Sequence, residues 1–296
     1  MDDNAWLERV AKINQHKKDG ERAPHKPLLI LYALGRLQRE RSSAVSFSEA
    51  EGPLAELLID AGRDPKPLYP FYRLQADGLW HVEMPDGKAP SESVALLRDG
   101  AVGQFTPELE AALLGSPSLI ANIARLLLDR EFPSTLHDDI LSSVGLSLSD
   151  VVIALERVAE LRRQRDPTFR KRVLYAYEDT CAFCGFDGLL ARVSVGLEAA
   201  HVRWWAYDGP DEVKNGVCLC SLHHKLFDRG VMAVNEDNRI AVSGHFRGTS
   251  EATSRFVGDL NGKEVRAPQA GQPRIAHEHS AWHRDQVFKA PERVAG

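Results

Sequence analysis

Apolar residues in the first half of the chain recur mostly at helical spacing, three or four positions apart. This periodicity predicts helices over residues 5–15, 28–39, 46–61, 107–113 and 118–130. Pro27 and Ser46 support two of these helix starts, because proline fits the first helical turn and serine caps it. Residues 64–67 are irregular, and shorter runs predict strands and turns at 68–74, at 78–82, around Asp86-Gly87 and around Asp99-Gly100.

The pattern changes after about residue 145. Helical spacing continues over residues 151–164 and 168–178, and a strand-like apolar run follows at 193–200. The boundary is not rich in Gly or Ser, so we expect a bridging helix rather than a flexible linker. We predict an α+β chain in four parts: a mixed helical and strand domain over residues 1–150, a bridging helix over 151–167, a second domain over 168–250, and a C-terminal extension over 251–296 that packs on the second domain.

Composition and charge narrow the classes of function. A length of 296 residues suggests two domains, and 43% hydrophobic with 27% charged residues allows buried cores. The net charge of −5 argues against a wholly basic nucleic-acid binder but permits local basic patches. One such patch lies directly before the first cysteine pair, where it forms either a solvated helix face or a nucleic-acid contact: Arg162, Arg163, Arg165, Arg170, Lys171 and Arg172.

Cellular location bears on the role of the cysteines. No apolar run is long enough to span a membrane, and the acidic start of the chain does not resemble a signal peptide. We therefore expect a cytoplasmic protein without a membrane partner. In that reducing compartment, the four cysteines favour metal binding or buried thiols over disulfides.

Two pairs of metal-binding residues share the spacing of a zinc knuckle. Cys181 and Cys184 form the first pair, and Cys220 and His223 form the second about forty residues later. Cys218 competes with Cys220, but only Cys220 reproduces the knuckle spacing with His223. The spacing predicts a structural Zn²⁺ site, and the alternative is a set of buried thiols without metal.

Three further polar residues occupy the same stretch. His201 ends a strand-like run, Asn215 precedes a glycine, and His224 enters a helix. Taken singly, each has an ordinary structural explanation: a core histidine, a turn residue and a helix residue. Taken in order, they describe a strand, a loop, a second strand and a helix, which is a ββα unit.

Residues 169–240 resemble an HNH nuclease domain of the ββα-metal class. The resemblance rests on Leu-Glu-Ala-Ala-His ending at residue 201, on Asn-Gly at 215–216, and on Leu-Cys-x-x-His-His-x-x-Phe-Asp-Arg-Gly from 219 to 230. It implies that His201 activates water, that Asn215 and His224 complete the catalytic set, and that the products carry a 5′-phosphate and a 3′-hydroxyl. Histidine suits this chemistry, because its proton affinity lies near neutral pH.

Phosphodiester hydrolysis also calls for a divalent cation such as Mg²⁺ or Mn²⁺ on the scissile phosphate. His224 is the best candidate ligand, and Asn215 either joins it or braces the loop that positions the base. Many HNH enzymes carry Asp or His directly before the base, where this chain has Ala200. Glu198 lies on the same strand face as position 200 and either reaches the ion or is a structural carboxylate. Asp228 either caps the helix or orients a neighbour.

Two patches in the first 150 residues combine cations with rigid or aromatic groups. Arg22, His25 and Lys26 lead into a helix N-terminus, where backbone N–H groups favour a phosphate. The segment Leu-Tyr-Pro-Phe-Tyr-Arg at 68–73 joins aromatic rings and proline to a cation. The structural alternatives are ordinary helix capping for the first patch and an aromatic core strand for the second.

The same patches resemble the sulfur-binding domain of phosphorothioate-dependent McrA-type restriction endonucleases. The motifs are His-Lys-Pro-Leu-Leu at 25–29, Tyr-Pro-Phe at 69–71 and Asp-Gly-Leu-Trp at 77–80. The resemblance implies an apolar cavity for the sulfur of modified double-stranded DNA. Its residues would be Tyr69 and Pro70 lining the cavity, Arg73 close by, His25 and Lys26 on the DNA, and Arg98 as a further contact.

This assignment has a physical rationale and two competitors. A non-bridging sulfur is more weakly hydrated than oxygen, so an apolar cavity disfavours the oxygen form. One such contact discriminates by about 1–3 kcal/mol. The competing hypotheses are an HNH nuclease that reads another mark, such as a methylated base, and a non-catalytic zinc-containing DNA-binding protein. A homodimer would let two nuclease units cut both strands.

The C-terminal segment carries three histidines in a metal-like cluster, His277, His279 and His283. His279 and His283 are four residues apart and would share a helix face. No cysteine or second ligand pair lies nearby to complete a site. A docking helix anchored by Trp282 and Phe288 is therefore the favoured interpretation.

Overall fold

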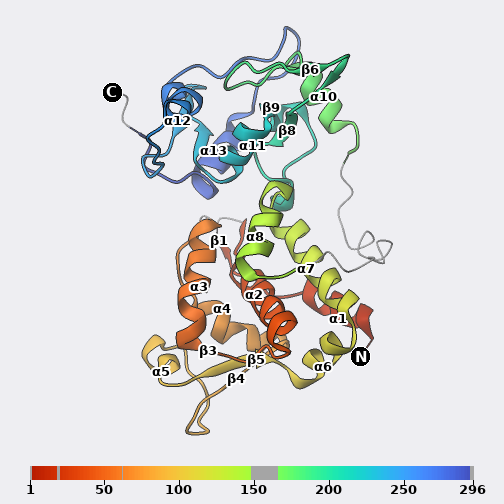
Figure 1. Cartoon of the computed structure of the whole chain (residues 1–296), viewed down its shortest axis with the longest axis vertical. Coiled ribbons are helices and arrows are strands. Elements are labelled where there is room, and N and C mark those ends of the chain that lie inside the picture. The colour runs from red at the N-terminus through yellow and green to blue at the C-terminus, as the bar shows by residue number, and fades with distance from the viewer. Residues whose placement is uncertain (1, 19–20, 62, 148–165, 294–296) are drawn as a thin grey trace. The chain divides into compact units, whose positions relative to one another are not determined.

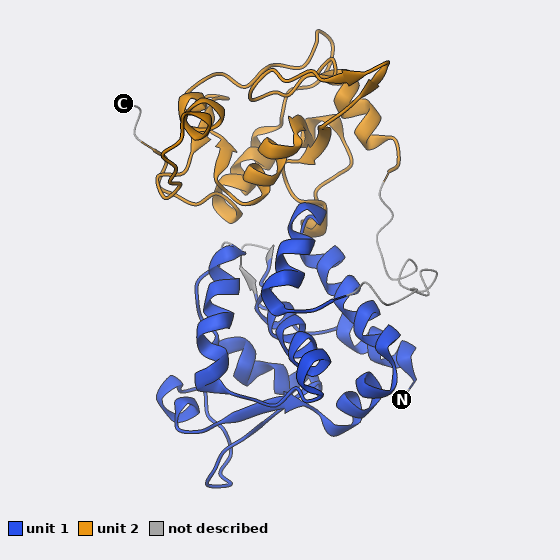
Figure 2. Cartoon of the chain, in the orientation of Figure 1, with its two compact units in different colours: residues 1–163 blue, residues 164–296 orange. Residues whose placement is uncertain are grey.

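A computed structural model describes residues 2–18, 21–61, 63–147 and 166–293. The chain forms two compact units, residues 1–163 and 164–296, which are described separately (Figures 1 and 2). The predicted helix over residues 151–164 lies outside the described residues, as do Arg162, Arg163 and Arg165 of the basic patch. Within the described ranges, no single helix has the length and apolarity to cross a membrane.

Unit 1 is a helical domain with a small antiparallel sheet, so the predicted α+β class is confirmed. Its helices are α1 (Asp3–Ala11), α2 (His25–Glu40), α3 (Phe47–Asp60), α4 (Leu68–Arg73), α5 (Val94–Arg98), α6 (Pro107–Gly115), α7 (Pro117–Glu131) and α8 (His137–Val144), with short 3-10 helices η1 (Leu74–Asp77) and η2 (Ser134–Leu136). Its strands are β1 (Lys17–Lys18), β2 (Glu21–Arg22), β3 (Val45–Ser46), β4 (Trp80–Glu83) and β5 (Val102–Phe105). Strands β1 and β2 pair with each other, and β5 lies between β3 and β4.

Helix α2 forms the centre of unit 1. Every residue from 27 to 35 is buried, and α2 packs against α3, α4, α7 and α8 (Figure 1). Gly35 lets α8 approach closely, because a Cβ there would lie 2.1 Å from the carbonyl oxygen of Val144. A helix apolar on all sides is typical of a core position.

Aromatic rings join the sheet to the helices of unit 1. Phe47, Phe71, Trp80 and Phe105 form a chain of edge-to-face contacts with successive centroid distances of 5.1, 5.7 and 5.7 Å. Gly103 leaves room for this chain, because a Cβ there would lie 2.5 Å from the Trp80 ring. The aromatic residues therefore fix α3 and α4 against β4 and β5.

The predicted strand at residues 68–74 was wrong, since these residues form α4 and the start of η1. Pro67 and Pro70 lie at the helix start, where missing N–H groups cost no helical hydrogen bond. The Phe71 N–H donates to the Pro67 carbonyl at 3.2 Å, a helical bond. Pro70, Phe71 and Leu74 are buried at helical spacing, and the alternating aromatic residues imitated a strand.

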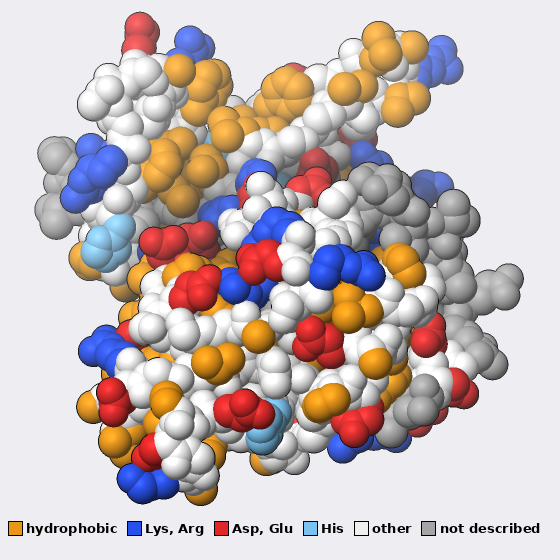
Figure 3. Space-filling model, turned by 60° about the horizontal axis from the view of Figure 1, so that its bottom comes forward, with side chains coloured by type: hydrophobic (Ala, Val, Ile, Leu, Met, Phe, Trp, Pro, Cys, Tyr) orange, Lys and Arg blue, Asp and Glu red, His pale blue; other side chains and the backbone are white. Residues whose placement is uncertain are grey.

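The surface charge agrees with the composition. On the face shown in Figure 3, acidic and basic side chains are interspersed in small groups among scattered hydrophobic ones.

Unit 2 contains the ββα unit predicted from the sequence. Its helices are α10 (Phe169–Ala176), α11 (Ser221–Asp228), α12 (Glu251–Phe256) and α13 (His277–Gln286), with short 3-10 helices η3 (Trp205–Tyr207), η4 (Val213–Asn215) and η5 (Gly258–Leu260). Its strands are β6 (Leu189–Leu190), β7 (Val193–Ser194), β8 (Leu197–His201), β9 (Gly216–Cys220), β10 (Met232–Val234) and β11 (Ile240–Val242). They pair antiparallel as β6–β7, β8–β9 and β10–β11.

Strands β8 and β9 bring the sequence motifs of this unit together. His201 pairs with Gly216 at one end of the ladder, and Leu197 pairs with Cys220 at the other. Helix α10 packs on this pair so closely that a Cβ on Gly216 would lie 2.4 Å from the Val173 side chain. Helix α11 starts directly after β9, so one short segment positions both histidines of the helix.

Helix α13 docks through buried side chains. Trp282 packs against Trp204 and Tyr207 at centroid distances of 5.9 and 5.6 Å, and Phe288 is partly buried. The His283 ring stacks on Phe227 at 3.7 Å. These contacts are those of a helix docked on the rest of the unit.

Candidate functional site

Three cysteines and one histidine form a compact cluster in unit 2. The ligand atoms of Cys181, Cys184, Cys220 and His223 all lie within 4.8 Å of one another. The first two residues belong to a tight turn, closed by a 2.9 Å bond from the Gly185 N–H to the Cys181 carbonyl. Gly185 has a φ of +76°, a conformation that favours glycine. The knuckle turn therefore sets the spacing of the first two thiols.

The donor set of this cluster fits a structural zinc ion. His223 Nδ1 lies 3.1 Å from Cys220 Sγ and 3.6 Å from Cys181 Sγ. Its other nitrogen, Nε2, lies 2.8 Å from the Phe256 carbonyl, which turns Nδ1 toward the thiols. Such an outer partner is typical of metal-binding histidines, and three thiols with one imidazole suit zinc.

Cys218 lies outside the cluster, although it is only two residues from Cys220. It is fully buried on β9, and burial raises the pKa of its thiol to about 12. Its carbonyl accepts the Ala182 N–H at 2.8 Å, so its backbone supports the knuckle turn. Cys220, and not Cys218, therefore belongs to the cluster.

His201 is held in a defined orientation at the end of β8. Its ring stacks on Phe169 with 4.1 Å between centroids and an interplanar angle of 18°. Its Nε2 lies 2.8 Å from Oδ1 of Asp211. The two side chains are only 15% and 13% exposed, so the pair is shielded from water.

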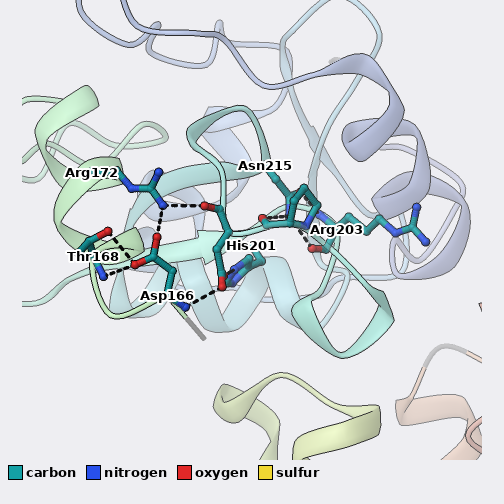
Figure 4. A network of polar contacts seen from close by, with 8 residues as sticks. Asp166, Thr168, Arg172, His201, Arg203 and Asn215 are labelled. Carbon is teal, nitrogen blue, oxygen red and sulfur yellow. Dashed lines mark hydrogen bonds and ion pairs between the residues drawn. The ribbon is translucent and has the colours of Figure 1, made fainter. Parts of the chain in front are cut away.

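Asp211 is fixed by contacts on both its side chain and its backbone. Oδ2 accepts the backbone N–H of Asp166 at 2.8 Å, and the carbonyl accepts the Arg172 guanidinium at 2.7 Å. Arg172 also pairs with the Asp166 carboxylate, which accepts two bonds from Thr168. Figure 4 shows Asp166 and Arg172 meeting on the same side of His201.

Asn215 braces the loop between the two strands. Its side chain is fully buried, and its Oδ1 accepts the Arg203 N–H at 2.8 Å. Its Nδ2 donates to the carbonyls of Arg203 and Pro210, both at 3.0 Å (Figure 4). The amide thus has partners on both its oxygen and its nitrogen within the loop that follows His201.

His224 lies between two carboxylates. Its Nδ1 is 2.6 Å from Oε2 of Glu198, and its Nε2 is 3.2 Å from Oδ2 of Asp228. Burial opposes a positive ring, but Asp228 and then Glu198 outweigh it and raise the His224 pKa to about 10. The hydrogen bond from His224 lowers the Glu198 pKa to about 2.

The carboxylates beside His224 have fixed positions. Glu198 Oε1 accepts the Ser221 hydroxyl at 2.6 Å, and Asp228 Oδ1 accepts the Trp204 indole N–H at 3.1 Å. Asp228 is buried, whereas Glu198 is about 39% exposed. Ala200, where a ligand is expected, is fully buried, so Glu198 is the β8 carboxylate that meets His224.

The sequence interpretation named Glu198 and Asp228, which contact His224, but not Asp211, which contacts His201. Asp228 carried a usable signal, because a residue four positions after His224 lies on the same helix face. Asp211 lies in a loop between a 3-10 helix and η4, where no periodicity points toward β8.

The predicted DNA-reading residues of unit 1 lie at the start of α2 and on α4. His25 is partly buried and its Nδ1 has no hydrogen-bond partner within the described chain. Burial, together with nearby Arg63 and Lys66, lowers the His25 pKa despite the opposing effect of Asp64. Burial raises the pKa of Glu131, and nearby Arg22 opposes this shift.

Lys26 is used inside the domain. Its ammonium donates to the Asn14 carbonyl at 2.7 Å and to Asp77 Oδ2 at 2.6 Å. Both charged side chains are largely buried, at 12% and 8% exposure. This ion pair ties the start of α2 to η1, and a contact from Lys26 to DNA remains a prediction.

Tyr69 and Arg73 form an exposed pair on α4. The Arg73 guanidinium lies 4.8 Å from the centre of the Tyr69 ring and 2.6 Å from Glu92. Tyr69 is 38% exposed, whereas the adjacent Pro70 is buried. Arg98 pairs with Glu51 through two bonds of 2.7 Å.

Comparisons with known families assign both halves of the chain. Residues 3–149 match the family described as ScoMcrA-like, DNA sulfur-binding domain, and residues 181–235 match the family HNH endonuclease. The chain combines a ScoMcrA-like DNA sulfur-binding domain with an HNH endonuclease domain. The sulfur-binding domain corresponds to unit 1, and the HNH match covers the zinc-type cluster, His201, Asn215 and His224.

Solved structures similar to the sulfur-binding domain include two complexes. The sulfur-binding domain of SprMcrA complexed with phosphorothioated DNA has 22% identity and a TM-score of 0.43, covering 49% of this chain and 95% of that one. The ScoMcrA sulfur-binding domain complexed with phosphorothioated DNA has 24% identity and a TM-score of 0.41, covering 48% and 95%.

A longer similar structure is that of the type IV phosphorothioation-dependent restriction endonuclease ScoMcrA. It has 23% identity and a TM-score of 0.39, covering 58% of this chain and 33% of that one. A comparison with curated protein sequences finds no match.

Proposed function

We propose that this protein recognises phosphorothioate-modified double-stranded DNA and hydrolyses its phosphodiester bonds in the HNH domain. The presence of both domains in one chain supports a modification-dependent endonuclease. The proposed hydrolytic activity rests on one observation. The ββα unit holds His201, which pairs with the Asp211 carboxylate, and it places Glu198 beside His224.

His201 acts as the general base that takes a proton from the attacking water. Its place at the strand end and its stacking on Phe169 hold the imidazole in one plane. Asn215 supports this role by bracing the loop after His201, since its amide is bonded to that loop. We expect products with a 5′-phosphate and a 3′-hydroxyl, as in the HNH nucleases that the sequence resembles.

Glu198 and His224 would hold the catalytic divalent cation, such as Mg²⁺ or Mn²⁺. A carboxylate oxygen and an imidazole nitrogen share a hydrogen across 2.6 Å, and the cation would displace this proton from His224 on binding. The other ring nitrogen of His224 faces buried Asp228, an arrangement typical of metal-binding histidines. A cation there supplies charge stabilisation to the scissile phosphate and to the leaving oxygen. Asn215 is assigned the bracing role rather than a ligand role.

Zn²⁺ bound to Cys181, Cys184, Cys220 and His223 has a structural role. These four residues supply a closed set of ligands, which leaves no position for water or substrate. The zinc ion would fix the start of α11 and hence the position of His224 on the same helix.

The sulfur-binding domain selects the substrate through residues around α4 and the start of α2. Tyr69 and Pro70 would line the sulfur cavity. The exposed ring of Tyr69 offers apolar surface that disfavours the well-hydrated oxygen form, and the buried Pro70 beside it is rigid. Arg73, which stacks on Tyr69, and His25 would contact the DNA backbone. Arg22, Lys26 and Arg98 are further proposed contacts.

Cleavage of two matched duplexes tests the proposal. One duplex carries a single phosphorothioate and the other is unmodified, and both are incubated with Mg²⁺ or Mn²⁺. We expect faster cleavage and tighter binding of the modified duplex, and loss of cleavage but not of binding in His201→Ala. Equal affinity for the two duplexes would overturn sulfur recognition, and wild type that cleaves neither would overturn the nuclease activity.

A further inference from the structure

We propose that Asp211 is a positioning residue that sets which nitrogen of His201 accepts the proton. This inference rests on the proposed role of His201 as the general base. Asp211 lies outside the HNH sequence motifs, on the loop between η3 and η4. Its carboxylate oxygen Oδ1 lies 2.8 Å from His201 Nε2, a hydrogen-bonding distance.

The chemistry of this contact fixes the tautomer of His201. An ionised carboxylate only accepts hydrogen bonds, so Nε2 must carry the hydrogen. A neutral imidazole then has its lone pair on Nδ1. The stack on Phe169 holds the ring plane, with 18° between the two rings, so the bond to Asp211 also fixes the direction of Nδ1. Nδ1 is therefore the nitrogen that takes the proton from water.

Asp211 is itself held in place before any substrate binds. Its second oxygen accepts the backbone N–H of Asp166, and its carbonyl accepts the guanidinium of Arg172. Asp166 lies just before α10 and Arg172 lies on it, and the same helix also supplies Phe169. One local unit thus fixes both the plane of the His201 ring and the acceptor at its Nε2.

The reaction step balances with these groups. The O–H bond of the attacking water breaks, its proton moves to His201 Nδ1, and its electron pair forms the new O–P bond. The P–O bond to the 3′ carbon's oxygen breaks, and the leaving oxygen takes a proton from solvent. The imidazolium that forms keeps its Nε2–H on Asp211, whose negative charge stabilises the new positive charge.

Asp211→Asn tests this role with almost no change in shape. In the variant, the amide oxygen can keep its hydrogen bond from the Asp166 N–H. The amide NH₂ group then faces His201 Nε2, so Nε2 must accept a hydrogen bond instead of donating one. The proton moves to Nδ1 and blocks the base. We expect the single-turnover cleavage rate to fall roughly 10²–10⁴-fold, with unchanged affinity for modified DNA. The acid limb of the pH–rate profile should also shift to lower pH, because a neutral amide stabilises the imidazolium less.

Matched variants separate this role from a loss of folding. Asp237→Asn changes an exposed aspartate of the same unit and should keep full activity. Asp211→Glu retains a carboxylate and should recover part of the rate. Adding Asp211→Asn to His201→Ala should cause no further loss, because both changes remove the same base. Zinc content and urea unfolding should match wild type in each variant.

The outcomes distinguish this inference from the proposed function. If His201→Ala abolishes cleavage but Asp211→Asn cleaves at the wild-type rate, the inference is wrong and the function stands. A loss that is equal in Asp211→Asn and Asp211→Glu, with an unshifted pH profile, also overturns the positioning role. If His201→Ala itself cleaves normally, the assignment of the base fails first.

Discussion

Burial of His283 should make the stability of the HNH domain depend on pH. The ring is fully buried, stacks on Phe227 and has Nε2 3.1 Å from the Phe227 carbonyl. Burial lowers its pKa from 6.5 to about 4, although Asp228 and the bond to Phe227 oppose this shift and Arg284 reinforces it. The folded protein therefore binds this proton more weakly than the unfolded chain does.

The sign and size of the effect follow from this difference. Above pH 6.5 the ring is neutral in both states and contributes no pH dependence. As the pH falls, the unfolded chain takes up the proton first, so the free energy of unfolding decreases. A shift from 6.5 to about 4 corresponds to about 3.4 kcal/mol below pH 4, and to about 2 kcal/mol at pH 5.

His283→Phe isolates this contribution, because it keeps a ring on Phe227 and removes the titrating group. Urea unfolding of the full chain between pH 5 and pH 8, followed by tryptophan fluorescence, gives the free energy at each pH. Between pH 8 and pH 5, the free energy of unfolding should decrease by about 2 kcal/mol less in the variant than in wild type. His277→Gln, at an exposed position of the same helix, should behave as wild type. Parallel pH curves for wild type and His283→Phe would refute the reasoning.

Four further predictions concern the two metals, the sulfur site and the core. Glu198→Gln should raise the Mg²⁺ concentration needed for half-maximal cleavage at least tenfold without weakening binding to modified DNA, as measured by metal titration; an unchanged midpoint would exclude Glu198 as a ligand. Cys220→Ser should lose stoichiometric zinc by metal analysis whereas Cys218→Ser retains it, and the reverse result would contradict the ligand set. Tyr69→Ala should reduce the preference for phosphorothioate over normal duplex by about 1–3 kcal/mol in a binding competition, whereas equal weakening for both duplexes would indicate a backbone contact instead. Gly35→Ala should lower the free energy of unfolding by about 1–3 kcal/mol in urea, because its Cβ would overlap the Val144 carbonyl, and wild-type stability would show that α8 moves freely.

The cluster of three cysteines and one histidine and the ββα unit were predictable because their signals are local. A knuckle places two ligands on one turn, so the spacing of Cys181 and Cys184 already encodes the geometry. The helix after Cys220 likewise fixes the directions of His223 and His224. In such segments the order of residues along the chain determines their order in space.

The sequence interpretation failed or stopped where tertiary contacts decide the structure. The helix at residues 68–73 was taken for a strand, because its aromatic residues alternate and its prolines discourage a helix. The burial of Phe71 against Phe47 and Trp80 decides that segment. Asp211 reaches His201 across a loop, and no spacing rule connects positions 201 and 211.

Lys26 shows a second limit of motif-based inference. A lysine at a helix start beside His25 suggests a phosphate contact, but its ammonium lies in a largely buried ion pair with Asp77. Breaking a buried pair by removing one partner is costly, since the remaining charge is uncompensated. A lysine at this position can therefore stabilise the fold through an ion pair or contact a phosphate, and the sequence alone does not distinguish the two roles.

Because two adjacent histidines of α11 make different contacts, the protein should tolerate no insertion or deletion that changes the register of this helix. Successive residues of a helix point about 100° apart, so His223 faces the thiols while His224 faces Glu198. Deleting one residue just before them would turn the second histidine toward the thiols and bring Lys225 opposite Glu198. A substitution on the exposed side of α11 leaves these contacts in place, whereas a single insertion or deletion ahead of the pair displaces both histidines at once.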